Sequence, residues 1–479
     1  MISLVSAPVV IALTAGFVAE AANGRLVYGD PSRLFATVST DSRKLTGADA
    51  ASGEARNNAL FIALKGPNFD GETFVPALLD AGVGGVLTTA AIPAGSSTAV
   101  IRVDDTLDAL QKIARAVRRA SAAKVVAITG SAGKTTTKEM TAELLSARFR
   151  VFRNVGNLNN HIGLPLSLLE LRHGAEIAVV ELGMNHANEI RTLIDISEPD
   201  VRMWTNVGDA HIGHFGSRDA IADAKGEILE HAGPSTLLIA NADDALIGAR
   251  ISKFPGRTIT FGMSAGATVR ATNVTDRGFD GSTADVAFDG GRPMPIAVPL
   301  PGRANLMNAL AAIAVAADSG VDAAEITARI GAMRAVGRRG EVTELANGAR
   351  LVDDSYNASP AAVQLALGSL KATPAVRRVA VLGEMRELGD LSRDLHFECG
   401  AAAEAAADVL IAIGGNDADA LAEGAAHAGL AGKCILRFAD SASAADAIGG
   451  IVRAGDLILI KGSRGTRTDI VADRLKGRA

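Results

Sequence analysis

A glycine-rich turn with one lysine and several hydroxyls has the clearest chemistry in this sequence. It reads Thr-Gly-Ser-Ala-Gly-Lys-Thr-Thr-Thr over residues 129–137, directly after the apolar run 125–128. Between a strand and a helix, such a turn binds phosphate through backbone N–H groups and the lysine, and a hydroxyl holds Mg²⁺. The turn is shorter than GxxxxGK[ST], and Ile128 occupies the first glycine position. A chance turn is the alternative. The predicted phosphate-binding residues are Gly130, Ser131, Ala132, Gly133, Lys134, Thr135 and Thr136.

Three more polar side chains follow apolar runs of the same kind. Glu181 lies near the end of the run 177–182, His211 follows the run 201–205, and Lys225 stands in Ala-Lys-Gly-Glu. Active sites of open parallel sheets lie beyond the carboxyl ends of strands, so a carboxylate there can face the Mg²⁺ of a nucleotide. The alternatives are a solvated strand-end charge, a histidine satisfied in the core and a lysine on a helix surface.

The elements that must position these residues follow from the alternation of apolar runs and helical patterns. In residues 119–336 that alternation predicts a doubly wound parallel α/β sheet around the turn. Residues 337–479 repeat it, with strands expected at 350–352, 379–382, 409–413 and 457–460, which predicts a Rossmann-like domain. Residues 1–118 read as a small α/β domain. A chain of 479 residues exceeds one hydrophobic core, so three domains are expected.

Composition narrows the classes of partner. Lys and Arg number 48 against 53 Asp and Glu, without a long basic run, which disfavours a nucleic-acid partner. The apolar stretch 4–22 has no Lys or Arg before Arg25, and Pro8 and Thr14 interrupt it. We therefore expect a buried helix there rather than a secretory signal or a membrane span, in a cytoplasmic monomer.

The compact TGxxGKTT turn resembles the Mur ligase and folylpolyglutamate synthase superfamily rather than kinases or GTPases. Further Mur ligase motifs occur in the right order along essentially the whole chain. The resemblance implies ATP and two Mg²⁺ ions as cofactors. It also implies that Glu181 and His211 help to hold the second ion and that Lys225 is carbamylated and supports it, with Thr135 as a further metal ligand.

Two segments resemble the nucleotide-binding parts of the family. Residues 301–310 resemble GxxNxxNALAA, which implies that Asn305 lies by the adenine; a helix N-cap is the alternative. Gly337-Arg338 matches the hinge arginine that reaches the γ-phosphate when the third domain closes, although Arg339 is an adjacent candidate.

The third domain opens with Asp-Asp-Ser-Tyr-Asn-Ala-Ser-Pro at 353–360, which resembles the signature of Mur ligases that add D-alanyl-D-alanine. Asp353 and Asp354 are expected to bind ribose hydroxyls, with an Asx turn as the alternative. The segments 382–389 and 461–464 resemble LGxMxELG and KGSR of the same ligases. The residues implied at the incoming dipeptide are Tyr356, Asn357, Lys461, Ser463 and Arg464.

The other substrate is implied by motifs in the first two domains. Asp-Ser-Arg at 41–43 and the segment 64–71 resemble the segments that bind the UDP end, which implies Ser42, Arg43, Lys65 and Asp70. Glu72 replaces the usual histidine there, and 49–58 looks like an inserted loop. Asn157, Asn159 and Asn160 match the GNLNNxIG loop near the peptide carboxylate.

The resemblance implies an ATP-dependent amide ligase that activates UDP-N-acetylmuramoyl-tripeptide as an acyl phosphate and joins it to D-alanyl-D-alanine. Other amide ligases of the superfamily, such as folylpolyglutamate synthase, are one alternative. A P-loop phosphotransferase and a non-catalytic nucleotide-binding module are the others. The identity of the third peptide residue, diaminopimelate or lysine, stays open.

Overall fold

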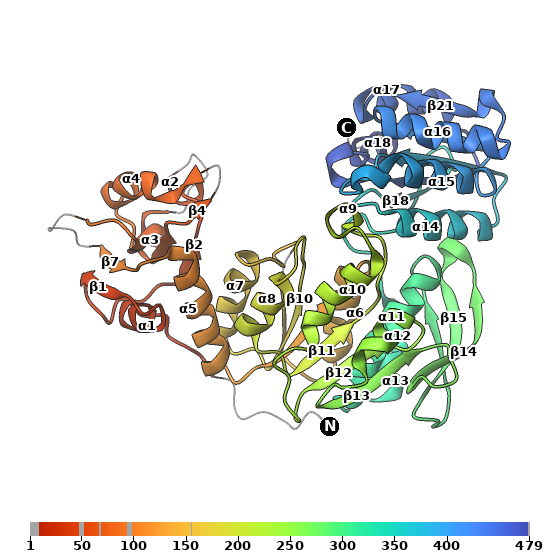
Figure 1. Cartoon of the computed structure of the whole chain (residues 1–479). Coiled ribbons are helices and arrows are strands. Elements are labelled where there is room, and N and C mark those ends of the chain that lie inside the picture. Colours follow the sequence, from red (N-terminus) through yellow and green to blue (C-terminus); the bar gives the residue numbers. More distant parts are fainter. Residues whose placement is uncertain (1–8, 47–51, 67–68, 93–97, 155, 478–479) are drawn as a thin grey trace.

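The computed structural model of the chain describes residues 9–46, 52–66, 69–92, 98–154 and 156–477. Residues 4–8 of the expected first helix, 49–51 of the expected inserted loop, and Pro67 and Asn68 lie outside these ranges. Three separate α/β sheets follow one another along the chain, with five, nine and six strands. Figure 1 shows three bodies, with the first, in red and orange, and the last, in blue, above the two ends of the central one. The expected fold class is confirmed.

The first sheet has strand order β1-β7-β6-β3-β2, in which only β1 and β7 are antiparallel. Its strands are β1 (Arg25–Tyr28), β2 (Thr37–Ser39), β3 (Ala59–Ile62), β6 (Gly85–Thr88) and β7 (Ala99–Arg102). A small hairpin joins β4 (Lys65–Gly66) and β5 (Phe69–Asp70). The helices are α1 (Ala15–Ala21), α2 (Arg43–Thr46), α3 (Gly53–Asn57), α4 (Val75–Asp80) and α5 (Thr106–Ala120).

In the described part of the apolar N-terminal stretch, residues 9–22, the helix covers only Ala15–Ala21. Thr14 is extended, and its hydroxyl accepts a hydrogen bond from Phe17 N, so it caps the N-terminus of α1. Before it, Val10 forms a bridge with His173 and Ile11 N donates to Arg172 O. The expectation of a helix was therefore wrong for residues 9–14: Val10 and Ile11 pair with the central domain, and Thr14 forms a bridge with Leu34 of the first domain.

The central sheet has strand order β16-β15-β14-β13-β12-β11-β8-β10-β9. Its strands are β8 (Lys124–Thr129), β9 (Val151–Arg153), β10 (Ile177–Glu181), β11 (Val201–Trp204), β12 (Leu237–Asn241), β13 (Arg257–Gly262), β14 (Val269–Asp276), β15 (Ser282–Phe288) and β16 (Met294–Val298). Seven strands from β9 to β14 run parallel, as expected, whereas β14, β15 and β16 form an antiparallel extension that the sequence did not predict.

Two helices of this domain pack together beside the phosphate-binding turn, α6 (Lys134–Leu145) and α12 (Gly302–Asp318). Most residues of α12 are buried, because the helix carries its own Ala and Leu side chains on all sides. The other helices are α7 (Gly163–Leu168), α8 (Glu189–Ser197), α9 (Ile212–Phe215), α10 (Arg218–Gly226), α11 (Ala245–Ile251) and α13 (Ala323–Ala332).

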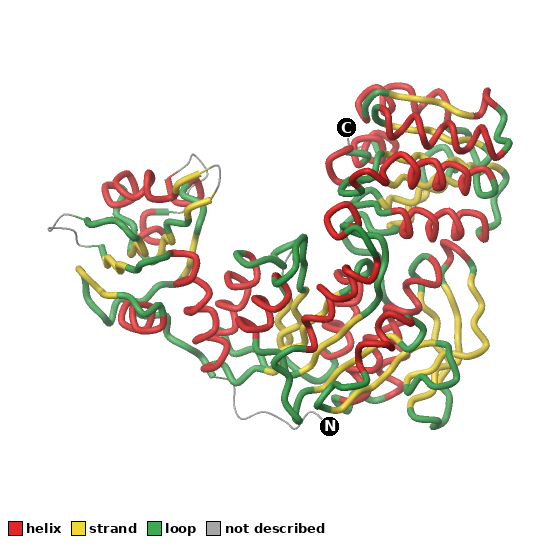
Figure 2. Tube along the Cα trace, in the orientation of Figure 1, coloured by secondary structure: helices red, strands yellow, loops and turns green. Residues whose placement is uncertain are grey.

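The third sheet has order β17-β18-β22-β19-β20-β21, with only β17 and β18 antiparallel. Its strands are β17 (Glu341–Glu344), β18 (Arg350–Asp354), β19 (Arg377–Gly383), β20 (Val409–Ile413), β21 (Ile435–Phe438) and β22 (Asp456–Lys461). Its helices are α14 (Pro360–Ala372), α15 (Ser392–Glu404), α16 (Asn416–Ala428), α17 (Ser441–Ile451) and α18 (Asp469–Leu475). Figure 2 shows these red helices over the yellow strands.

Contacts between the domains fix where the outer two lie. Arg118 of α5 donates to the backbone carbonyls of Ala123 and Ser197, which joins the first domain to the second. At the other end, Phe279 N donates to Thr373 Oγ1, 2.8 Å away, and Asp280 pairs with Arg350.

None of the described helices is long and apolar enough to cross a membrane.

Candidate active site

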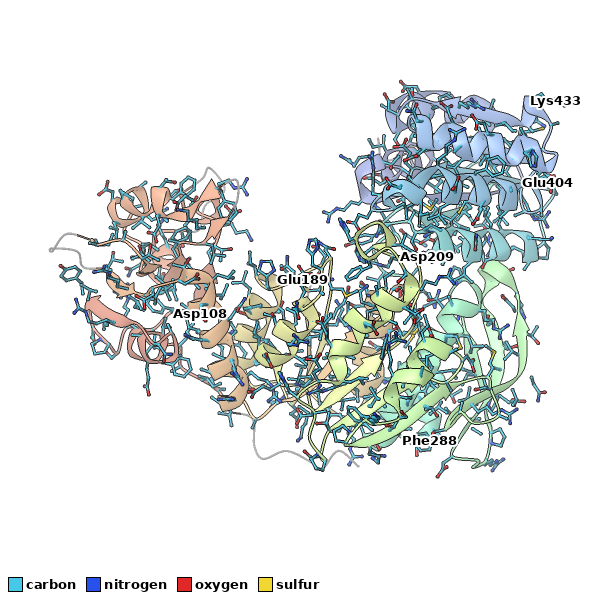
Figure 3. The ribbon with its side chains drawn as sticks, viewed as in Figure 1. Asp108, Glu189, Asp209, Phe288, Glu404 and Lys433 are labelled. Atoms are coloured by element: carbon cyan, nitrogen blue, oxygen red, sulfur yellow. The ribbon has the colours of Figure 1, made fainter. Side chains whose placement is uncertain are left out.

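The phosphate-binding turn lies at the carboxyl end of β8, between two neighbouring strands that end at the same level. The register pairs Ile128 with Glu181 of β10 and Thr129 with Trp204 of β11. Residues after these three strands therefore meet at one edge of the sheet. Figure 3 labels Glu189 and Asp209 on this side of the central domain, which faces the other two domains.

Two glycines of the turn are required by close approach. A Cβ on Gly130 would lie 2.0 Å from Thr205 Oγ1, and one on Gly133 would lie 2.5 Å from Asn308 Oδ1. Gly133 also has φ +78°, a conformation that side chains disfavour. The short spacing of the two glycines thus lets the turn pack against the loop after β11 and against α12.

Asn206 holds the first half of the turn. Its Oδ1 accepts from Ala132 N (2.9 Å), its Nδ2 donates to Ala132 O (2.9 Å), and its carbonyl accepts from Ser131 N (3.1 Å). The N–H groups of Ser131 and Ala132 are thus bonded to Asn206 in this structure, and their expected contact with phosphate stays a prediction. The N–H groups without helical partners are those of the first turn of α6, from Lys134 to Thr136. Sequence reasoning missed Asn206, although it follows the strand end that we singled out.

Lys134 folds back over the turn. Its Nζ donates to Gly130 O at 2.8 Å. Burial lowers the pKa of Lys134, Glu181 opposes that shift, and the charge of Arg339 adds to it. The amine thus lies where the turn would surround a phosphate, and an anion there would favour its positively charged form.

Glu181 is the centre of the polar contacts and is 4 % exposed. Its Oε2 accepts from Thr135 Oγ1 (2.7 Å) and its Oε1 from Asn159 Nδ2 (2.7 Å). A hydroxyl and a carboxylate oxygen at this separation are the ligand types that Mg²⁺ prefers. The predicted metal ligands Thr135 and Glu181 are therefore brought together, and Asn159 joins them from its loop.

The charges of Lys134 and Glu181 also act on Lys225. It is 1 % exposed on α10, and its pKa is well below the usual value because of burial and the neighbouring charge of Lys134, while Glu181 opposes the shift. A low pKa leaves a larger neutral fraction of the amine, the form that reacts with CO₂ to give a carbamate.

His211 contacts the third domain rather than this cluster. Its Nδ1 lies 2.6 Å from Glu387 Oε2, and this contact lowers the pKa of Glu387. Gly213 N also donates to Glu387 O, 3.1 Å away. In the described ranges no three His, Cys, Asp or Glu side chains gather closely enough to hold a metal ion. Of the four predicted metal residues, Thr135 and Glu181 are in contact and Lys225 is close enough for its pKa to respond to Glu181. His211 instead contacts Glu387.

The two hinge arginines point in different directions. Arg338, which we expected at the γ-phosphate, has φ +57° and ion-pairs with Asp473 (2.9 Å) and Asp353 (3.7 Å). Arg339 instead donates to Thr135 Oγ1 (3.1 Å), and its guanidinium lies 3.6 Å from the centre of the Tyr356 ring. Arg339 is thus the hinge arginine that contacts the turn in this structure, while the expected role of Arg338 at the γ-phosphate stays a prediction. The left-handed conformation of Arg338 turns the chain between them, which the sequence did not reveal.

A cavity of about 330 Å³ opens beside the start of α6. Thr135, Thr136 and Arg339 line it on the side of the turn, and its other lining is mixed: apolar Met140, Leu300, Met333 and Val336, and charged Glu139, Glu143, Arg153, Arg329 and Arg334. The apolar part suits a planar aromatic base joined to a phosphate chain.

Asn305 is neither an N-cap nor a lining residue of that cavity. It lies in the first turn of α12, where its Nδ2 donates to Pro301 O (2.8 Å) and its Oδ1 accepts from Asn308 Nδ2 (3.1 Å). Asn308, which sequence reasoning overlooked, is the member of the pair that approaches Gly133. Its position three residues after Asn305, on the same helix face, was the available signal.

The carboxyl ends of the third sheet carry a second polar cluster. Lys461 Nζ donates to Asp354 Oδ2 (2.6 Å) and Asn357 O (3.1 Å), and burial raises the pKa of Asp354. Asp353 is fully buried and bound by Lys476 (2.8 Å). Asp354, expected at the ribose, and Lys461, expected at the dipeptide, thus form an ion pair with each other, whereas Asp353 is bound inside its own domain.

The remaining predicted residues of the third domain lie in neighbouring loops. Ser463 Oγ accepts from Arg386 N (3.0 Å), and Ser463 N donates to Glu384 O (3.1 Å). Arg464 is exposed at the following turn. The segments 382–389 and 461–464 are therefore in direct contact.

The residues expected at the UDP end stay in the first domain, away from the turn. Arg43 pairs with Asp41 (2.9 Å), Ser42 O accepts from Leu45 N (2.9 Å), and Lys65 pairs with Asp70 (3.3 Å) across the hairpin. Glu72 accepts from Thr89 N (2.7 Å).

The three predicted asparagines of the loop before α7 have different partners. Asn160 Oδ1 accepts from Gly163 N (2.8 Å), and Asn157 O accepts from Asn159 N (2.8 Å). Only Asn159 reaches Glu181. The side chain of Asn157 is exposed.

Comparison with known proteins gives the family. Residues 128–316 match the Mur ligase middle domain, and residues 338–464 match the domain described as Mur ligase, glutamate ligase domain. The UDP-N-acetylmuramoyl-tripeptide–D-alanyl-D-alanine ligase of Bacillus subtilis is 34% identical over 92% of this chain and 93% of its own length. Among solved structures, MurF of Acinetobacter baumannii has a TM-score of 0.85 at 30% identity, covering 98% of this chain and 99% of its own. MurF ligase of Thermotoga maritima in complex with ADP has a TM-score of 0.79 at 28% identity, covering 92% and 97%. With a phosphate-binding turn, a buried carboxylate and three α/β domains in the same order, this chain belongs to the Mur ligase family.

Proposed function

We propose that this chain joins D-alanyl-D-alanine to UDP-N-acetylmuramoyl-tripeptide, with ATP converted to ADP and phosphate. The contact of Thr135 with buried Glu181, beside Lys134, carries the proposal, because it gathers the groups that a carboxylate and a triphosphate need in order to approach each other. The name of the Bacillus subtilis relative supports the choice of substrates.

The first step activates the peptide. An oxygen of the tripeptide carboxylate attacks the γ-phosphorus of ATP, the bond to the β-phosphate oxygen breaks, and ADP leaves. Lys134 and the N–H groups of the first turn of α6 hold the transferred phosphate, and Arg339 offers its guanidinium from the hinge. The product of this step is an acyl phosphate.

Thr135, Glu181, His211 and a carbamylated Lys225 would hold two Mg²⁺ ions. Bound there, the ions supply charge that screens the repulsion between the carboxylate and the triphosphate. The oxygen pair of Thr135 and Glu181, 2.7 Å apart, suits such an ion, and the lowered pKa of Lys225 favours carbamate formation.

The second step forms the amide. The amine of D-alanyl-D-alanine attacks the acyl carbon, phosphate leaves with one of the original carboxylate oxygens, and the amine loses a proton. The cluster of Asp354, Lys461 and Asn357 is our candidate for the dipeptide side of the site, together with Tyr356, Ser463 and Arg464. Asp354 and Lys461 offer one charge of each sign, which suits a zwitterionic dipeptide.

The nucleoside half of ATP is assigned to the cavity beside α6. Thr136 lies at its edge, so a nucleotide whose phosphates follow the turn would reach the apolar walls with its base. The ADP complex of the Thermotoga maritima relative supports nucleotide binding in this fold.

The direct test is release of phosphate from ATP with each peptide substrate present, absent or both present. The ligase account expects release only when the tripeptide precursor and D-alanyl-D-alanine are both present. Phosphate transferred to a hydroxyl without the dipeptide would favour a phosphotransferase, and release that needs folate and glutamate would favour a folylpolyglutamate synthase.

Several expectations stay predictions. They are the domain boundaries at 118/119 and 336/337, the UDP contacts of Ser42, Arg43, Lys65 and Asp70, and the peptide contacts of Asn157 and Asn160. The cytoplasmic location and the monomeric state belong with them.

A further inference from the structure

A buried lysine and a buried asparagine next to Glu181 have no role in the proposed chemistry. Lys138 lies one turn beyond Lys134 on α6, and Asn154 follows β9; each is 1 % exposed. Charged and amide groups are costly to remove from water unless they gain polar partners. Their partners therefore indicate what the two side chains do.

Asn154 uses both ends of its amide. Its Oδ1 accepts from Glu181 N (3.2 Å), and its Nδ2 donates to Leu158 O (3.0 Å). The ladder between β9 and β10 ends at the pair of Arg153 and Val179. Beyond that pair, the side chain of Asn154 supplies the acceptor for Glu181 that a longer strand β9 would have supplied. It also ties the main chain of Glu181 to the loop 156–160.

Asn159 closes this link from the other side. Its Nδ2 donates to Glu181 Oε1 (2.7 Å), and its carbonyl accepts from Gly183 N (2.8 Å). The carboxylate of Glu181 and the backbone before and after it are thus held by Asn154 and by a loop that Asn154 itself anchors.

Lys138 attaches Asn154 to the helix that begins at the phosphate-binding turn. Its Nζ donates to Asn154 O at 2.5 Å and ion-pairs with Glu139 at 3.2 Å. Glu139 in turn pairs with Arg153 at 3.0 Å, so the end of β9 is joined to α6 at two neighbouring residues.

We infer that Asn154, held by Lys138, is a positioning residue that fixes Glu181 and the loop 156–160 relative to the phosphate-binding turn. The inference rests on the proposed function, because it assigns Glu181 to the triphosphate and the loop to the peptide carboxylate. Small displacements of reacting groups are costly, and the outer partners of site residues are worth about 10–100-fold in activity.

The test replaces Asn154 by Leu, which has a similar size and makes no hydrogen bonds. We expect kcat for phosphate release to fall by on the order of 10–100-fold. The Kd of ADP, measured by calorimetry, should stay within about twofold, because within the described ranges the Asn154 side chain bonds Glu181 N and Leu158 O rather than residues 130–136. Asn154→Asp, which keeps the acceptor for Glu181 N but loses the donor to Leu158, provides a second variant should Asn154→Leu fail to fold.

Lys138→Met should change kcat in the same direction. Because Lys138 acts through Asn154, the double variant should be no slower than the slower single variant. Thr141→Val is the matched control on the same helix: its Oγ1 donates only to Thr137 O, 2.7 Å away, so kcat should stay at the wild-type value.

A wild-type kcat in folded Asn154→Leu or Asn154→Asp, or additive losses in the double variant, would overturn the inference. An equal loss of kcat in Thr141→Val would also overturn it, because general loosening of α6 would then explain the effect. If the wild-type protein released phosphate without either peptide substrate, the proposed function would fail instead, so the two failures are distinguishable.

Discussion

The charge of one carboxylate, Glu181, acts on two lysines, the partly buried Lys134 and the buried Lys225. Burial lowers the pKa of both lysines, and Glu181 acts against that shift in each case. The two need different charge states in the proposed chemistry, since Lys134 neutralises phosphate and Lys225 must lose its proton to form a carbamate. The anionic triphosphate would favour the charged form of Lys134, which lies on the turn itself.

Lys134→Met should reduce kcat by about 100-fold or more, because a positioned charge at the transferred phosphate is lost. Initial rates of phosphate release with both peptide substrates measure this effect. Lys112→Met, on the exposed face of α5 where the lysine pairs with Asp108, is the control and should leave the rate unchanged. Turnover at the wild-type rate in Lys134→Met would refute the phosphate-binding assignment.

The neighbouring arginines give a second comparison. Arg339→Gln should lower kcat by about 100-fold or more, because it removes the guanidinium that contacts Thr135. Arg338→Gln should lower kcat by less than about tenfold, since Arg338 mainly pairs with Asp473 and such partly exposed pairs contribute little. Steady-state rates with both substrates decide between them, and a larger loss in Arg338→Gln would support the assignment made from the sequence.

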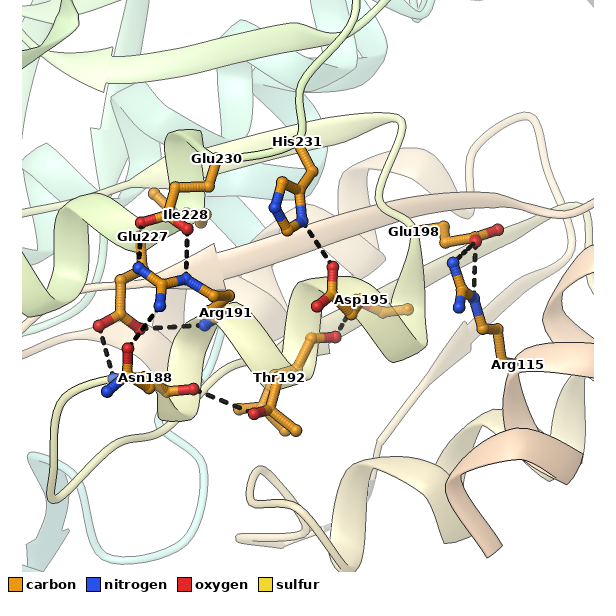
Figure 4. A network of polar contacts seen from close by, with 12 residues as sticks. Arg115, Asn188, Arg191, Thr192, Asp195, Glu198, Glu227, Ile228, Glu230 and His231 are labelled. Carbon is orange, nitrogen blue, oxygen red and sulfur yellow. Dashed lines mark hydrogen bonds and ion pairs between the residues drawn. The ribbon is translucent and has the colours of Figure 1, made fainter. Parts of the chain in front are cut away.

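At the scale of elements, Glu227 joins the segment of Lys225 to the segment that follows Glu181. Its Oε1 accepts from Asn188 N (2.6 Å) and its Oε2 from Arg191 N (3.0 Å), at the first turn of α8. Figure 4 shows these contacts, with Glu230 bound to Arg191 beside them. A buried carboxylate at a helix N-terminus satisfies free N–H groups and the helix dipole together.

Glu227→Ala should lower the free energy of unfolding of the central domain by about 1–3 kcal/mol, because it leaves buried N–H groups unsatisfied. Trp204, the single tryptophan, is fully buried in β11 and reports on this domain by fluorescence in urea. Glu230→Ala removes only a part-exposed ion pair and should cost about 1 kcal/mol or less. Equal losses in the two variants would contradict the role given to Glu227.

The elements that sequence predicted best are those with strong local signals. The run 125–128, the glycine turn and the strand ending at Glu181 were all located, because apolar runs and glycines have direct structural causes. The antiparallel strands β14 to β16 were missed. Polar and apolar residues alternate in them, so they lack the continuous apolar runs by which the other strands of this domain were recognised. The roles of Asn206, Asn308 and Arg339 at the turn depend on contacts between distant segments, which a single sequence does not display.

At the scale of the whole molecule, the first and third domains lie at opposite ends of the central domain (Figure 1). The residues assigned to UDP and those assigned to the dipeptide are thus carried by different bodies. The contacts of Arg339 with Thr135 and of Glu387 with Gly213 join the third domain to the central one near the turn. A substrate that touches all three domains would favour their closure.

Small-angle X-ray scattering should therefore show a smaller radius of gyration when the tripeptide precursor and a non-hydrolysable ATP analogue are both bound. The analogue alone should produce a smaller decrease, because it contacts only the central and third domains. An unchanged radius with both ligands bound at saturation would argue against closure around the two substrates.

The central claim is that the peptide carboxylate becomes an acyl phosphate before the amine attacks. Its most direct measurement uses the tripeptide precursor with ¹⁸O in the terminal carboxylate, ATP and D-alanyl-D-alanine, followed by mass spectrometry of the released phosphate. The account predicts one ¹⁸O atom in each phosphate, carried over from the carboxylate. Phosphate that contains no oxygen from the carboxylate, released while the amide still forms, would contradict it.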